Sequence, residues 1–76
     1  MVIVLIKINV KIKEVREEKG ISLRELERRT GIDRHYLADL EKMPADEILV
    51  SEAVFISRAL GVTIEDLFVA VTLEII

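Results

Sequence analysis

The chain has 76 residues, a length that allows one hydrophobic core but no second domain. Folding at this length removes only about 60% of the unfolded chain's surface from water, so we expect the domain to gain stability by oligomerisation. Apolar residues make up 51% and charged residues 33% of the sequence, which excludes a disordered chain and a membrane span. We therefore expect one soluble globular domain over residues 1–76.

The sequence contains no cysteine, which excludes disulfide bonds and thiolate metal sites and suits a reducing compartment. The apolar start over residues 1–6 has neither a basic leader nor a small-residue cleavage site, and it is too short to span a bilayer. We therefore expect a cytoplasmic protein without a targeting segment or a membrane partner.

The net charge of −3 opposes binding to a polyanion, but the charges are unevenly distributed. Through Lys42 the chain has ten basic and eight acidic residues, a net of +2. From Met43 onward it has one basic and six acidic residues, a net of −5. The front half therefore permits a surface that binds nucleic acid, with a weak electrostatic footprint.

Strand patterns lie at both ends of the chain. Apolar and polar residues alternate after a β-branched apolar run at the start, which predicts a strand over about residues 2–8. The same two-residue alternation predicts a second strand over residues 69–75. We expect the first strand to give way to a helix near Asn9, which can cap a helix start, and this helix to end at Gly20.

Two further helices follow, separated by a short turn. Ser22 and Glu25 have the spacing of a capping box, in which each side chain satisfies a backbone donor at the start of a helix. Gly31 supplies the left-handed backbone of a tight turn, and Asp33 offers the next cap. The pattern predicts a third helix that ends near Lys42.

The second half of the chain predicts two more helices. A fourth helix follows a loop over residues 44–49, and its start stays open between Val50, which has the character of an inward core residue, and Ser51, which is a good cap. Thr63 and Asp66 form a second capping-box pattern, which predicts a short fifth helix before the last strand.

Two short helices joined by a glycine turn over residues 22–42 have the geometry that lays the second helix in the major groove of DNA. The motifs KGIS, TGI, YL and ALGVTIEDLF resemble the helix-turn-helix family of phage lambda repressor and Cro, the Xre family, over roughly residues 10–68. The resemblance implies a mainly α fold of five short helices, flanked here by short N- and C-terminal β-strands. It also implies a DNA-binding transcriptional regulator, and the small size of the chain fits a repressor or an antitoxin.

The resemblance places the family's site residues on this sequence. The base-reading positions fall on Arg34, His35, Ala38 and Asp39. The phosphate-contacting positions fall on Ser22, Arg24, Arg28 and Lys42. Arg34 is the best candidate to read guanine, since arginine does so through two hydrogen bonds. Two other interpretations stay open: an ordinary solvated face for the third helix, and simple charge spacing for the arginines of the second helix.

The sequence departs from the family pattern at several positions. Leu23 replaces the usual glutamine, and Met43 replaces the glycine that usually follows the third helix. Glu27 replaces a small residue where the two helices cross, so its carboxylate must turn outward or find a partner such as Arg34. The loop over residues 44–49 is acidic and apolar rather than basic, which opposes phosphate binding.

Apolar residues on the fourth helix and in the terminal strands point to a homodimer. A two-stranded ribbon is marginal by itself, whereas two ribbons across a dimer axis form an antiparallel four-stranded sheet. The residues expected in this interface are Ile3, Leu5, Phe55, Val71 and Leu73. The alternative is a ribbon that packs only on its own helices and covers the fourth helix.

Catalysis finds no support in the sequence. One histidine, no cysteine and serines at helix starts give no nucleophile and base pair, and no metal-ligand cluster or glycine-rich phosphate loop is present. We therefore expect no enzyme, no cofactor and no metal. A second hypothesis is a protein-interaction module, a helix-turn-helix fold that has lost or weakened DNA binding and dimerises or binds another protein.

Overall fold

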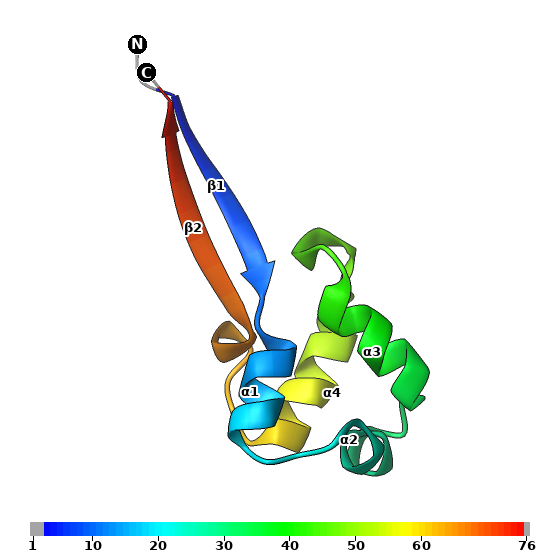
Figure 1. The fold of residues 1–76 in the computed structure, drawn as a ribbon. Helices are drawn as coiled ribbons and strands as arrows, with labels where there is room; N and C mark the ends of the chain where they lie inside the picture. Colours follow the sequence, from blue (N-terminus) through cyan, green and yellow to red (C-terminus); the bar gives the residue numbers. More distant parts are fainter. Residues whose placement is uncertain (1–2, 76) are drawn as a thin grey trace.

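Two antiparallel strands form a ribbon that projects from a body of four α-helices (Figure 1). The computed structural model describes the backbone of residues 3–75 and the side chains of residues 7–71. Strand β1 covers Ile3–Val10 and strand β2 covers Phe68–Ile75, paired in register from Ile3 opposite Ile75 to Val10 opposite Phe68. Both predicted strands are confirmed in place, apart from residue 2, which lies outside the described residues.

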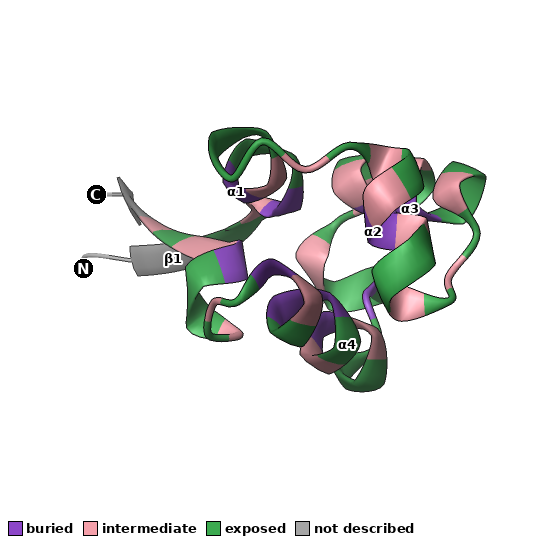
Figure 2. Cartoon of the chain, turned by 90° about the horizontal axis from the view of Figure 1, so that it is seen from below, coloured by how far each residue is buried: buried purple, intermediate pink, exposed green. Residues whose placement is uncertain are grey.

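The helical body contains α1 (Ile12–Glu18), α2 (Leu23–Thr30), α3 (Arg34–Lys42) and α4 (Val50–Leu60). Their inward side chains form one core beneath the ribbon, and the buried positions lie where the helices face one another (Figure 2). The core residues are Ile12, Val15, Leu26, Leu37, Leu40, Ile48, Ala53, Ile56, Leu60 and Leu67. No helix within the described residues is both long and apolar enough to traverse a bilayer.

The change from strand to helix occurs later than predicted. Strand β1 continues through Val10, because Asn9 pairs with Val69 in the ribbon rather than capping a helix. Helix α1 begins at Ile12 without a side-chain cap, and the Lys11 N–H donates to the Leu67 carbonyl at 2.7 Å. This hydrogen bond joins the base of the ribbon to the helical body.

The predicted fifth helix is not confirmed. Thr63 and Asp66 form their reciprocal capping contacts, with N–O distances of 3.0 and 3.3 Å, but the turn that follows is a 3-10 turn of three residues, Glu65–Leu67. The helix stops there because the next residue enters β2 and pairs with β1. Strand pairing therefore prevails over the local helix signal.

Helix α4 starts at Val50, with Leu49 at the cap position. The carboxylate of Glu52 accepts a hydrogen bond from the Leu49 N–H at 3.1 Å, so Ser51 is not the cap. The side chain of Val50 is 75% exposed, and its assignment as an inward core residue is wrong. The preceding loop contains a 3-10 turn at Ala45–Glu47.

An ion pair inside the body joins α1 to α3. The Arg16 guanidinium donates to the Glu41 carboxylate from Nε at 3.0 Å and from Nη2 at 3.3 Å, and its Nη1 donates to the Ile21 carbonyl at 2.9 Å. The two side chains are only 11% and 4% exposed. The pair therefore fixes α1, the turn after it and α3 relative to one another.

Only half of the first predicted capping box forms. Ser22 Oγ accepts from the Glu25 N–H at 3.0 Å, but the Glu25 carboxylate turns to two arginines of its own helix. It accepts from Arg28 Nε at 2.8 Å and from Arg29 Nε at 3.0 Å. The hydrogen bonds from Arg28, and then those from Arg29, lower the pKa of Glu25 from 4.5 to about 2.

Removal of the Glu41 carboxylate tests the buried ion pair. We expect Glu41→Ala to lower the free energy of unfolding by about 3 kcal/mol, because Arg16 would keep its charge in a shielded position without a counter-ion. Lys13→Ala is the control, since it breaks an exposed ion pair with Glu17 that is 4.0 Å long, and its cost should be below about 1 kcal/mol. Urea unfolding measures both, and equal costs would contradict the structural role of the pair.

The depressed pKa of Glu25 predicts an acid-sensitive contact in α2. A carboxyl whose pKa is lower in the folded than in the unfolded state stabilises the fold at pH values above the unfolded pKa. This contribution is lost as the pH falls from about 4.5 through about 2. A titration of the Glu25 carboxyl followed by NMR should have a midpoint near pH 2, and the double variant Arg28→Ala/Arg29→Ala should return it toward 4.5. Arg24→Ala serves as the control and should leave the midpoint unchanged.

Candidate nucleic-acid interface

Helices α2 and α3 form a closely joined pair. Gly31 lies between them with a φ of 76°, and its N–H donates to the Glu27 carbonyl at 2.8 Å. The Thr30 hydroxyl accepts from the Ile32 N–H at 3.1 Å and donates to the Leu26 carbonyl at 2.8 Å, which closes the turn. The predicted turn is confirmed, and the left-handed backbone at its glycine explains the residue type.

The outward flank of α3 carries the four positions predicted to read bases. His35 and Asp39 are exposed, and Arg34 and Ala38 are partly covered. His35, Asp39 and Lys42 follow one another at helical spacings of four and three residues, so they share one side of the helix. The structure therefore places these side chains on a common surface opposite the core residues Leu37 and Leu40.

The start of α3 is capped by carboxylates of the chain itself. Asp33 Oδ1 accepts from the N–H groups of His35 at 2.8 Å and Tyr36 at 3.4 Å. These contacts, that from His35 first, lower the pKa of Asp33. Glu27 Oε2 accepts from the Arg34 N–H at 2.8 Å. The first three N–H groups of α3 are thus already occupied and not free for a phosphate.

Glu27 contacts the side chain of Arg34 as well as its backbone. The distance between Arg34 Nη1 and Glu27 Oε1 is 3.6 Å, and the two side chains are 41% and 32% exposed. The carboxylate at the helix crossing has therefore found the partner that the sequence indicated.

The predicted phosphate-contacting residues differ in whether their side chains already have a partner within the chain. Arg28 is bound to Glu25, and the Ser22 hydroxyl already accepts a backbone hydrogen bond. Arg24 and Lys42 are exposed and form no ion pair within residues 7–71. These two residues, one on each helix, are the strongest remaining candidates for phosphate contact.

Two contacts between α4 and the helix pair were not found by sequence reasoning. Arg29 Nη1 donates to the Ala59 carbonyl at 3.0 Å, which joins α2 to α4. The Glu52 carboxylate near the Tyr36 phenol raises the pKa of Tyr36. Both join residues far apart in the sequence, so local patterns carry no signal for them.

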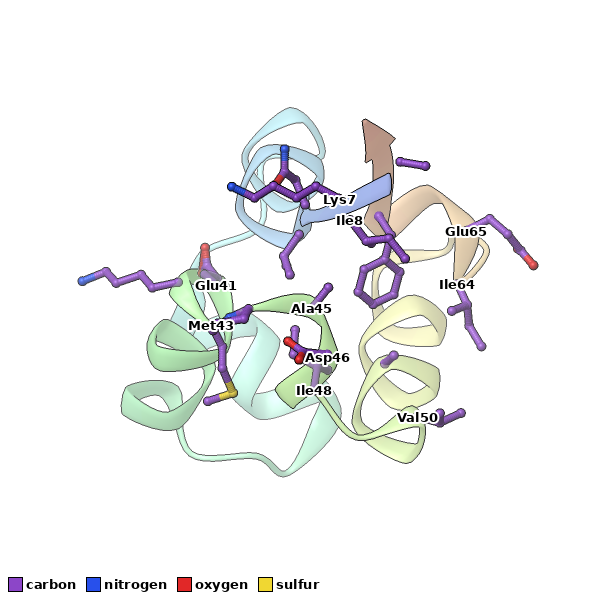
Figure 3. A pocket seen from close by; sticks show the side chains of 17 residues that line it. Lys7, Ile8, Glu41, Met43, Ala45, Asp46, Ile48, Val50, Ile64 and Glu65 are labelled. Atoms are coloured by element: carbon purple, nitrogen blue, oxygen red, sulfur yellow. The ribbon is translucent and has the colours of Figure 1, made fainter. Parts of the chain in front are cut away.

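An open groove of about 1130 Å³ lies between the base of the ribbon and the start of α4 (Figure 3). Ile8 lies on its ribbon side, and Met43 and Ile48 lie on the opposite side.

Within the described part of the chain no group of three histidine or acidic residues is arranged to hold a metal ion.

The residues predicted for a dimer interface are only partly described. Phe55 is 56% exposed on α4, and Val71 is half-buried on the ribbon. The side chains of Ile3, Leu5 and Leu73 lie outside the described residues, which include only their backbone positions in β1 and β2.

A family model described as helix-turn-helix matches residues 12–67, which include all four α-helices and the 3-10 turn after them. No curated protein and no solved structure matches the chain. The match covers most of the chain and includes the helix pair described above. The chain therefore belongs to the helix-turn-helix family of the Xre and lambda repressor type, a family of DNA-binding regulators.

Proposed function

We propose that the protein is a DNA-binding transcriptional regulator that acts as a homodimer and inserts α3 into the major groove. The observation that carries this proposal is the outward flank of α3, where His35 and Asp39 are exposed and Arg34 and Ala38 are only partly covered. A helix with such a free polar flank fits the major groove, and its side chains reach the base edges.

The charges around α3 determine how tightly such a surface binds. Arg24 and Lys42 supply positive charge at the two helices, whereas Asp39, Asp46 and Glu47 are exposed nearby in the sequence. Neutralisation of phosphates provides most of the affinity for DNA of any sequence. We therefore expect weak binding to unrelated DNA and a dependence of tight binding on the base contacts of Arg34.

A second copy of the chain is the partner that the ribbon favours. Each strand of the ribbon pairs only with the other within residues 3–75, so both outer edges have unpaired backbone groups. Unpaired edges promote pairing with another strand, and a two-stranded ribbon is marginal in water. Phe55 and Ile8 add exposed apolar surface on α4 and β1. We propose that these surfaces meet their equivalents in a second copy.

Replacement of Arg34 tests base reading. We expect Arg34→Ala to weaken binding to a duplex selected from random sequences by roughly 5-fold to 150-fold, with the loss concentrated at one guanine. Lys42→Ala should instead weaken binding to all duplexes alike. It should also reduce the slope of log affinity against log salt concentration by the equivalent of about one phosphate contact. Both are measured by mobility shift at several salt concentrations.

Failure of the wild-type protein to enrich any duplex at low salt would contradict the proposed function and favour a protein-interaction module. Lys13→Ala, on an exposed position of α1, controls for the loss of a positive charge outside the helix pair.

Replacement of exposed apolar residues tests the homodimer. We expect Phe55→Asp and Val71→Asp each to raise the dissociation constant of the dimer by at least about 30-fold, because a buried carboxylate without a partner is unfavourable at an interface. Val50→Asp is the matched control, since Val50 lies on the same helix, about 140° around its axis from Phe55. Sedimentation equilibrium measures the dissociation constants, and a monomeric wild-type protein would refute the dimer.

A further inference from the structure

The carboxylate of Glu27 contacts Arg34 at two places. One oxygen accepts from the backbone N–H at 2.8 Å, and the other lies 3.6 Å from Nη1 of the guanidinium. Glu27 is on α2 and Arg34 is the first residue of α3, so the contact crosses between the two helices. The backbone contact fixes the position of the carboxylate, and the carboxylate then attracts the guanidinium.

This contact leaves the edge of Arg34 that can read a base free. A guanidinium has five N–H donors, and the contact with Glu27 concerns Nη1. Within the described residues neither Nε nor Nη2 of Arg34 forms a hydrogen bond, although the Arg34 side chain is partly covered. The Nε and Nη2 pair has the spacing that matches O6 and N7 of guanine. One side of the Arg34 guanidinium therefore lies near a carboxylate, and its other edge is available.

The other carboxylates near the start of α3 do not take this role. Asp33 accepts from the N–H groups of His35 and Tyr36 and lies 3.3 Å from His35 Nδ1. Glu25 is bound to Arg28 and Arg29 on α2. Among the described residues, Glu27 is the acidic residue that forms an ion pair with Arg34.

We propose that Glu27 is a positioning residue that orients Arg34 toward a guanine and, in the same contact, reduces the attraction of Arg34 to phosphates. This inference rests on the proposed DNA-binding function. A restrained side chain loses less conformational freedom on binding than a free one, which favours the one base that matches its orientation. The adjacent negative charge opposes binding to any phosphate, so DNA of unrelated sequence binds less tightly. Glu27 thus raises discrimination and lowers general affinity.

The variant Glu27→Gln separates the two effects. Its amide oxygen can still accept from the Arg34 N–H, but its charge is gone. We expect discrimination between guanine and the other bases at the Arg34 position to fall by roughly threefold to tenfold, which is the factor for immobilising one flexible side chain. We expect affinity for unrelated duplexes to rise by about threefold. The slope of log affinity against log salt concentration should steepen by the equivalent of about one phosphate contact.

Glu25→Gln is the matched control. It removes the same charge from the same helix, but its partners are Arg28 and Arg29 rather than Arg34. We expect it to raise general affinity while leaving discrimination at every base pair unchanged. Equal discrimination in Glu27→Gln and wild type, on a duplex that wild type selects, would overturn the positioning role while leaving the proposed function intact. Absence of any selected duplex for wild type would instead overturn both.

A measurement on the free wild-type protein tests the restraint without any variant. Side-chain ¹⁵N relaxation should show the Arg34 guanidinium to be more ordered than that of Arg24, which is exposed and forms no ion pair within residues 7–71. Equal mobility of the two guanidinium groups would overturn the inference even if Glu27→Gln failed to fold.

Discussion

The ion pair between Arg16 and Glu41 is the constraint on which the surface of α3 depends. Helices of eight and nine residues, the lengths of α2 and α3, are not stable alone in water, so their position comes from tertiary contacts. Core leucines hold α3 onto the body, but apolar contacts have less directional geometry than hydrogen bonds. The paired hydrogen bonds from Arg16 to Glu41 have a fixed geometry. They set the orientation in which the outward flank of α3 faces solvent.

The carboxylates that cap the start of α3 also oppose the approach of a phosphate to that end of the helix. Asp33 and Glu27 satisfy the first N–H groups of the helix, and negative charge there interacts favourably with the helix dipole. A phosphate would otherwise bind at such a helix start. The chain has thus replaced an external anion with its own carboxylates. In the proposed DNA complex, Arg24 and Lys42 are then the leading candidates to contact the phosphates, because they are exposed and form no ion pair within residues 7–71.

The sequence predicts those features that depend on local patterns. Periodicity identified the core side of α3, and the cap at Asp33 and the glycine turn at Gly31 are confirmed because each is decided by neighbouring residues. Several features that depend on distant residues were missed, although the pairing of the two terminal strands was predicted. Arg16 and Glu41 are 25 positions apart, and no local pattern links them. The predicted fifth helix is not confirmed for the same reason, since pairing of β2 with β1 determines where that helical turn ends. The partner of Glu27 could be predicted because Arg34 is only seven positions further along the chain.

The ribbon gives the proposed dimer a direct mechanical link to α3. Lys11 hydrogen-bonds to Leu67 at the base of the ribbon, directly before α1 begins, and Arg16 on α1 holds α3 through Glu41. The short helix α1 therefore connects directly to the base of the ribbon and forms an ion pair with α3. Eight residues of strand extend about 26 Å, which is comparable to the roughly 34 Å between successive major grooves on one side of a duplex. How far two ribbons overlap would set the spacing of the two α3 helices, so a change in ribbon register would alter DNA binding without any change in α3 itself.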